Sequence, residues 1–319
     1  MSAQFELAVR AIEDPAAWRA RRIELWRSRN LATGQYVDFE AAWLAEDTLK
    51  RLLGHPPSTM GVVAYDVLCN SQRVGDCWLH VEPSGRTRRA SLWEFNAANW
   101  SGADASELLA LLVATAHGHG ASGLEVRAFR GDRATYHLVE TGELHRISSL
   151  MVRRIDTTAG PTEIVPKIEI ISMSAEQFAA NLDHLIAEYA SSLFRAGIFS
   201  EHEAQADARR QTAMMLPRGI ATQSHSWFVI RFGENVVGTL WLFESRMDAS
   251  GHVFDVEILA EYRGKGFGRA AMIAAENYFR GRNAQYLELN VFGYNDVARG
   301  LYESLGYVSV EESFIRDHP

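Results

Sequence analysis

The feature that most constrains the fold of this chain is an internal repeat. The segment VGDCWL at Val74–Leu79 reappears in the second half as VGTLWL at Val237–Leu242. The repeat offset is the distance in sequence from Val74 to Val237, and at this offset Glu94 corresponds to Glu257. Further matches keep the same offset: Phe5-Glu6-Leu7 with Ile168-Glu169-Ile170, Leu124-Glu125 with Leu287-Glu288, Phe129 with Phe292, and Leu138 and Glu140 with Leu301 and Glu303. Matches that recur in the same order indicate a duplicated domain.

The repeat also predicts where the domains divide. A chain of 319 residues exceeds the usual size of a single core. The segment RRIDTTAGPTEIVPK at Arg153–Lys167 is polar and contains glycine and proline, as linkers often do. We therefore expect a first domain at residues 1–155, a linker at 156–166 and a second domain at 167–319.

Hydrophobic periodicity in the second copy predicts an α/β (α+β) fold. An amphipathic helix is expected at Met173–Leu193, where Ser174 and Gln177 have the spacing of a capping box. A second helix follows at 200–216, and two strands flank the turn at Gly233–Asn235. Next come a strand at His252–Leu259, a glycine loop, a helix, a strand at Gln285–Phe292, a short helix beginning at Asn295 and a last strand. This order predicts, in each copy, a mixed and mostly antiparallel sheet flanked by helices.

Composition excludes several classes of partner. The net charge of −8 and the pI near 5.8 argue against nucleic-acid binding, which favours a basic face. No apolar run approaches the roughly 18 residues of a membrane span, so we expect no membrane association and a cytoplasmic location. Cys69 and Cys77 are expected to be reduced. His117 and His119 lack a third ligand, so no metal site is expected.

The candidate binding element is the glycine loop EYRGKGFGRA at Glu261–Ala270. A strand, a glycine turn and a helix start direct free backbone N–H groups at an anion, and Arg263, Lys265 and Arg269 add positive charge. A plain connecting turn is the alternative. A nicotinamide site would require a βαβ unit and G-x-G-x-x-G, whereas this loop follows an antiparallel meander and reads G-x-G-x-G. A P-loop would require G-K-[ST] after the glycines.

Two linked segments resemble the GNAT N-acetyltransferase family. Arg263-x-x-Gly266-x-Gly268 is similar to the family signature [QR]-x-x-G-x-[GA], between a strand and a helix. Downstream, LELNVFGYNDVARGLYESLGYV is similar to the second family motif. The resemblance covers residues 167–316, and through the repeat residues 5–155 in degraded form. It implies two tandem GNAT-like domains and acetyl-CoA as cofactor. The binding residues that it implies are Ile258, Leu259, Arg263, Gly264, Lys265, Gly266, Phe267, Gly268, Arg269, Asn295 and Tyr302.

Acyl transfer to an amine requires a base and an acid. An alkylamine with a pKa near that of lysine, about 10.4, must lose a proton before it attacks, and the departing thiolate must gain one. The resemblance assigns the acid to Tyr302. Glu257 is the candidate base, with Asp255 as the other candidate carboxylate and a purely structural glutamate as the alternative. Asn295 fits both a ligand contact and a helix cap. Trp227 and Trp241 fit both an acceptor pocket and the core.

The first copy lacks the residues that this mechanism needs. At the repeat offset, Arg263 becomes Trp100 and Tyr302 becomes Val139. Gly266 and Gly268 become Ala103 and Ala105. We therefore predict that the first copy is degenerate and does not bind coenzyme A productively.

Together these residues predict an N-acetyltransferase that moves an acetyl or short acyl group from acetyl-CoA to a primary amine by direct attack in a ternary complex. The acceptor class includes small molecules and peptides, and the chain is expected to be a monomer or homodimer. One alternative is a non-catalytic acyl-CoA-binding or sensing protein. A second is an acetyltransferase similar to mycothiol synthase.

Overall fold

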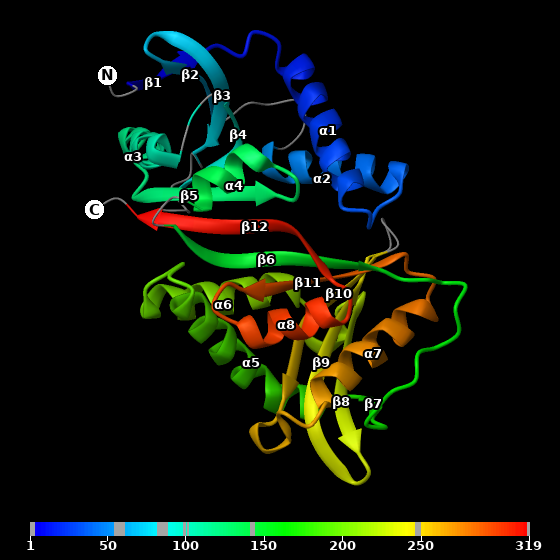
Figure 1. The fold of residues 1–319 in the computed structure, drawn as a ribbon. Helices are drawn as coiled ribbons and strands as arrows, with labels where there is room; N and C mark the ends of the chain where they lie inside the picture. The colour runs from blue at the N-terminus through cyan, green and yellow to red at the C-terminus, as the bar shows by residue number, and fades with distance from the viewer. Residues whose placement is uncertain are drawn as a thin grey trace. The chain divides into compact units, whose positions relative to one another are not determined.

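The chain folds into two compact units, seen here in a computed structural model (Figure 1). One unit contains Met1–Ser149 with Val310–Pro319, and the other contains Leu150–Ser309. The structure describes residues 4–53, 61–81, 89–97, 100, 102–140, 144–245 and 250–317.

Both halves of the chain present the same succession of helices and strands. The first half runs β1 (Phe5–Arg10), α1 (Pro15–Ala32), α2 (Asp38–Leu53), β2 (Val62–Cys69), β3 (Gln72–His80), β4 (Arg89–Ala97), α3 (Gly102–Gly118), β5 (Gly123–Phe129), α4 (Arg133–Glu140) and β6 (His145–Arg154). The second half runs β7 (Glu169–Ser172), α5 (Ala175–Arg195), α6 (Glu201–Met215), β8 (His225–Phe232), β9 (Asn235–Glu244), β10 (Ser250–Ile258), α7 (Phe267–Arg280), β11 (Tyr286–Phe292), α8 (Asp296–Ser304) and β12 (Val308–Asp317). Two short 3₁₀ turns, Gly219–Ala221 and Ala260–Tyr262, interrupt the second half.

The spacing of these elements confirms the repeat. Strand β2 begins at Val62 and strand β8 at His225, which are separated by the repeat offset. Strand β5 begins at Gly123 and strand β11 at Tyr286, and this pair is separated by the same offset. The structural repeat therefore has the same spacing as the sequence repeat.

The sheets confirm the predicted fold class. Strands β1 to β5 are neighbours in chain order in the first unit, and β7 to β11 are neighbours in the second. The pairs are antiparallel except for β4 with β5 and β10 with β11, which are parallel. Each sheet is thus mixed and mostly antiparallel. Strand β7 was not predicted as a separate strand, since it has only four residues.

The last strands of the two copies are exchanged between the units. Strand β12 pairs antiparallel with β5, from Glu311 opposite Phe129 to Asp317 opposite Gly123. Strand β6 neighbours β11, and its residues from Leu150 belong to the second unit. The observed units therefore differ from the expected boundaries at residues 155 and 167. The physical reason is that each copy's final strand forms its backbone hydrogen bonds with the other copy's sheet.

Alternating side chains place the helices on opposite faces of the second sheet. Trp227, Val229 and Trp241 pack with Phe178 of α5 and Leu216 beyond α6. The intervening residues Phe228, Ile230, Leu240 and Leu242 pack instead with alanines and Phe279 of α7. Because successive strand residues point to opposite faces, α5 and α6 cover one face and α7 and α8 the other. Trp227 and Trp241, which are stacked 4.3 Å apart, are therefore core residues.

Local signals in the sequence produce the predicted helix start and a tight hairpin turn. Ser174 and Gln177 form a reciprocal capping box at the start of α5. The β2–β3 hairpin turns at Asn70 and Ser71, which both have positive φ. Cys69 and Cys77 are free thiols, as predicted.

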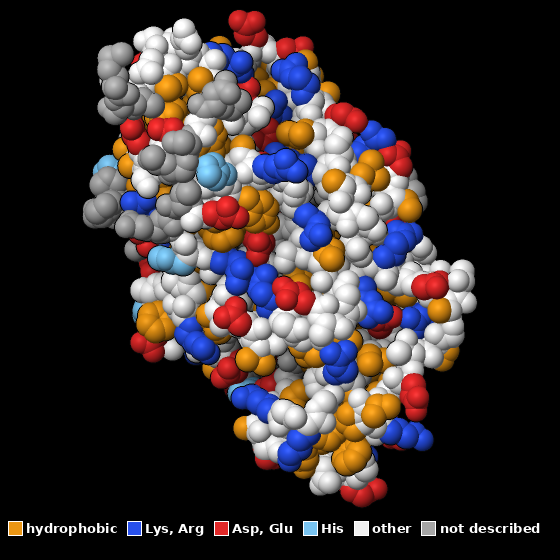
Figure 2. Space-filling model, in the orientation of Figure 1, with side chains coloured by type: hydrophobic (Ala, Val, Ile, Leu, Met, Phe, Trp, Pro, Cys, Tyr) orange, Lys and Arg blue, Asp and Glu red, His pale blue; other side chains and the backbone are white. Residues whose placement is uncertain are grey.

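Two further properties concern possible partners. Basic and acidic side chains are interspersed on the face drawn in Figure 2. Among the described residues, none of the helices combines the length and the apolar character that crossing a bilayer requires.

Candidate active site

Strands β10 and β11 separate before β10 reaches the glycine loop. They pair in parallel from Ser250 with Tyr286 to Val253 with Leu289. Beyond that point β10 continues to Ile258, still paired with β9, and β11 continues to Phe292. The described backbone shows no further pairing between β10 and β11, so the facing edge of β10 has N–H groups without a strand partner.

The backbone N–H groups at the end of β10 differ in whether they can bind a ligand. Leu259 donates its N–H to the carbonyl of Val237 over 2.9 Å, so this predicted ligand contact is already occupied within the protein. Successive N–H groups of a strand point to opposite edges. The N–H of Ile258 therefore faces the edge from which β11 has separated.

The glycines of the loop have two different structural roles. Gly264 and Gly266 have φ angles of +72° and +85°, a region that side chains with a Cβ disfavour. Gly266 is the N-cap of α7, and no side chain caps the helix there. Gly268 lies inside the first turn of α7, where a Cβ would come within 3.3 Å of Leu301. The turn therefore leaves the first amides of α7 without a side-chain acceptor, and Gly268 allows α7 to approach α8.

The three cations of the loop are held close to it. The Nε of Arg263 donates to the carbonyl of Ile258 over 2.8 Å, and the Nζ of Lys265 donates to the carbonyl of Glu261 over 2.8 Å. Arg269 contacts the hydroxyl of Ser304. Phe267 points the other way and is buried in the core. Asn295 caps α8, because its Oδ1 accepts the N–H of Ala298 over 3.1 Å.

Acidic side chains occupy the α5 face of β10. Val256 and Ile258 pack toward α7 and α8, so the alternating residues Asp255 and Glu257 face α5. Burial raises the pKa of Asp255 to about 7, and the charge of Glu257 acts in the same direction. Both oxygens of Glu257 contact the Nε2 of His184 on α5, at 3.2 and 3.0 Å.

The sequence reasoning missed His184. Helix α5 also carries Glu188 one turn further on, whose charge contributes to the raised pKa of Asp255. The spacing of His184 and Glu188 places them on the same side of a helix, which is a visible but weak signal. Nothing in the sequence indicates that this side faces β10.

Tyr302 lies on the opposite face of the sheet from these carboxylates. It is buried among residues of α7 and α8. Burial raises its pKa to about 12, and the charge of Asp255 adds to this effect. The phenol is thus close enough to Asp255 for their charges to interact, although α8 and α5 cover different faces. This arrangement places carboxylates and a protonated phenol on the two sides of the opening between β10 and β11.

Comparison with known proteins assigns the fold and the family. Residues 186–307 match the acetyltransferase (GNAT) family. The chain is 29% identical over 143 residues to the uncharacterised N-acetyltransferase YycN of Bacillus subtilis, covering 44% of this chain and 92% of YycN. The second half of this chain therefore matches the GNAT acetyltransferase family. A second Bacillus subtilis relative, the uncharacterised N-acetyltransferase YdgE, is 25% identical over 42% of this chain and 88% of its own length.

The whole chain, not only its second half, has a GNAT-like fold. A crystal structure of a GCN5-related N-acetyltransferase from Sphaerobacter thermophilus superposes with a TM-score of 0.53 and 16% identity. The match covers 98% of this chain and 95% of that protein. This likeness extends the GNAT fold to the first copy and says nothing about its activity.

Proposed function

We propose that the second unit transfers an acetyl or short acyl group from acetyl-CoA to a primary amine by direct attack in a ternary complex. The observation that carries this proposal is the arrangement around the end of β10. An opening between two parallel strands leads to uncapped helix amides on one side, and it lies between carboxylates and a protonated phenol. The acceptor is a small molecule or a peptide terminus.

The residues at the loop fit the pyrophosphate of coenzyme A. Gly264 and Gly266 adopt the left-handed conformation that turns the amides of the loop and of α7 toward one point, and helix N-termini favour negative charge. Arg263, Lys265 and Arg269 add positive charge around it. The N–H of Ile258 would bind the thioester carbonyl. When bound, the cofactor supplies an activated acyl group with a thiolate as leaving group.

We assign removal of the amine proton to the carboxylate pair of Asp255 and Glu257. With a pKa of about 7, raised by burial and by the charge of Glu257, Asp255 can take up and release a proton near neutral pH. His184 contacts Glu257 and lowers the pKa of Asp255 through its charge. An amine that reaches β10 from the α5 face would meet this pair first, directly or through one water.

We assign protonation of the thiolate to Tyr302. A phenol with a pKa of about 12 is fully protonated at neutral pH and is available as a donor. It lies on the far side of the sheet from the carboxylates, so the proton leaving the amine and the proton reaching the sulfur follow separate routes. Acetyl transfer then forms one C–N bond and breaks one C–S bond, with no covalent acyl-enzyme.

Tyr302→Phe tests this assignment against a matched control. General acid catalysis contributes roughly 100-fold to 10,000-fold, so thiol release from acetyl-CoA with a panel of amines should fall at least about 100-fold. Affinity for coenzyme A, measured by calorimetry, should change less than about twofold. The control is Tyr307→Phe, which removes a buried hydroxyl with no hydrogen-bond partner among the described residues, 6.0 Å away between ring centroids.

Each outcome distinguishes a function. A loss confined to Tyr302→Phe supports the assignment, and an equal loss in both variants would show a packing effect. Tight binding of coenzyme A without turnover on any amine would make the protein an acyl-CoA sensor and end the enzymatic proposal.

The first unit is proposed to be non-catalytic. At the position of Arg263 it has Trp100, whose ring packs 4.6 Å from that of His137 and whose Nε1 donates to the carbonyl of Ala97. Val139 is buried at the position of Tyr302, and Ala105 is buried at that of Gly268. The side chain of Ala103 lies outside the described residues. We therefore expect that the acetyl transfer remaining in the Tyr302→Phe variant does not depend on residues of the first unit.

A further inference from the structure

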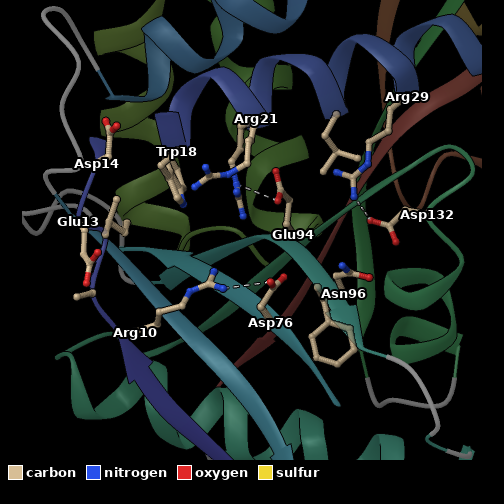
Figure 3. A pocket seen from close by; sticks show the side chains of 15 residues that line it. Arg10, Glu13, Asp14, Trp18, Arg21, Arg29, Asp76, Glu94, Asn96 and Asp132 are labelled. Atoms are coloured by element: carbon tan, nitrogen blue, oxygen red, sulfur yellow. Dashed lines mark hydrogen bonds and ion pairs between the residues drawn. The ribbon is translucent and has the colours of Figure 1, made fainter. Parts of the chain in front are cut away.

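A cavity of about 780 Å³ opens in the first unit, and the proposed reaction does not use it (Figure 3). It lies between α1, the segment that follows β1, and strands β3 and β4. Four arginines line it, three from α1 and one from the end of β1: Arg21, Arg22, Arg29 and Arg10. Its volume is within the range of small-molecule sites, about 300–1,000 Å³.

Three of the four guanidinium groups are held by carboxylates of the wall. Arg22 lies 3.2 Å from Glu94, Arg29 lies 2.7 Å from Asp132, and Arg10 lies 3.2 Å from Asp76. Glu94 is held in turn by the indole N–H of Trp26 over 2.9 Å. These pairs fix the arginine side chains and leave each pair without net charge.

Some of the guanidinium donors nevertheless have no aligned acceptor among the described residues. Arg21 is exposed and has no ion-pair partner among the described residues. The Nε of Arg22 is buried and lies near Glu94, but it forms no hydrogen bond within the described part of the chain. One terminal nitrogen of Arg29 is also buried without a hydrogen bond there. A buried N–H group without an aligned acceptor is unfavourable, and more so when the group is charged. Burial also lowers the pKa of Arg22, and the charges of Arg10 and Arg21 act in the same direction.

The corresponding place in the second unit has the opposite chemistry. At the repeat offset, Arg21 corresponds to His184 and Glu94 to Glu257. Arg10, Arg22 and Arg29 correspond to Met173, Leu185 and Ser192, none of which is charged. The second unit therefore lacks these cations, whereas the first unit has four arginines among the carboxylates that line its cavity.

We propose that this cavity binds a small organic molecule through a carboxylate or phosphate group, and that Arg21 and Arg22 hold the oxyanion. A guanidinium presents paired N–H donors that match the two oxygens of such a group. Asp76, Glu94 and Asp132 are each paired with an arginine, and Asp14 accepts the N–H of Ala17, so Glu13 is the lining carboxylate whose charge would oppose an anion. The side chain of Arg22 also stacks on Trp18, 4.8 Å from the ring, which restricts its orientation.

The test is calorimetric titration of the full-length protein with two probes, succinate and inorganic phosphate, at constant ionic strength. Each titration is repeated with saturating coenzyme A, so that binding at the glycine loop of the second unit is blocked. Arg21→Gln should weaken the tighter probe at least tenfold, and Arg21→Lys, which keeps the charge but loses the paired donors, should weaken it by less. Arg209→Gln is the matched control, since Arg209 is exposed on α6 and the change in net charge is the same.

The expected result is saturable 1:1 binding that Arg21→Gln weakens and Arg209→Gln leaves within twofold. The tighter probe then identifies the chemical source as a carboxylate or a phosphate. Absence of saturable binding of both probes, or equal weakening by the two variants, would overturn the proposal. Thiol release should be unchanged in Arg21→Gln, so that failure here is distinguishable from failure of the proposed acetyl transfer.

Discussion

Replacement of Asp255 by asparagine should stabilise the second unit, and more so at high pH. The pKa of Asp255 is about 7 in the folded chain and 3.8 ordinarily, a difference of about three pH units. Because burial and Glu257 raise the pKa, the folded state binds the proton more tightly than the unfolded state. Stability is therefore lost as the pH rises from about 4 to about 7, and the full cost is present above that range.

The size of the effect follows from linkage. At about 1.4 kcal/mol per pH unit, the cost of ionising Asp255 reaches about 4 kcal/mol at pH 8.5 and about 2 kcal/mol at pH 5.5. The variant cannot ionise, so its advantage over wild type should be about 2 kcal/mol larger at the higher pH. For a unit spanning Leu150–Ser309, this corresponds to about 4–8 °C in Tm.

Thermal unfolding of wild type and Asp255→Asn at pH 5.5 and pH 8.5 measures how the stability advantage of the variant changes with pH. Asp183→Asn, which removes an exposed carboxylate from α5 of the same unit, is the control and should give nearly the same small change at both. An Asp255→Asn advantage that is equal at the two pH values, or larger at pH 5.5, would refute the assignment of a raised pKa. The same variant should lose activity if Asp255 shares the amine proton.

Three other substitutions test separate parts of the second unit. Gly266→Ala forces a Cβ into the left-handed region, at a cost of about 1–2 kcal/mol, and should weaken coenzyme A binding at least tenfold by calorimetry; unchanged affinity would remove the loop from the site. His184→Gln removes a charge that lowers the pKa of Asp255, so the acidic limb of the kcat/KM profile should move to higher pH, and a fixed limb would count against the carboxylate pair. Gly251→Ala would place a Cβ 2.6 Å from the ring of Phe279 and should cost about 1–3 kcal/mol, seen as a lower Tm; a neutral result would mean that the ring moves aside freely.

Local chemistry made much of this fold predictable. Ser174 and Gln177 specify a helix start with atoms three residues apart, and the glycines at 264 and 266 specify backbone angles that few other residues adopt. Because corresponding segments of the two copies are separated by the same number of residues, an element predicted in one copy also predicts its counterpart in the other. Elements defined by nearby residues were therefore predicted with close boundaries.

Features that depend on distant residues were not predictable in the same way. Nothing in the sequence of β6 or of β12 specifies which of two similar sheets the strand joins. The contact between His184 and Glu257 joins residues far apart in sequence and depends on which side of α5 packs against β10. Leu259 was expected to bind a ligand through its amide, but strand register pairs that amide with Val237.

The two copies place different side chains at corresponding positions of the same succession of helices and strands. Glu94 in the first copy corresponds to Glu257 in the second. Glu257 contacts His184, whereas Glu94 contacts Arg22. Glu94 is buried and Glu257 is partly exposed, and each is held by a donor from the first helix of its own copy. What differs is the helix opposite, where substitutions on one side of α1 and α5 decide which charge a ligand meets. Most of β12 belongs to the unit of the first copy and the residues of β6 from Leu150 belong to the unit of the second, so deletion of either copy would leave strands of the other without their pairing partners.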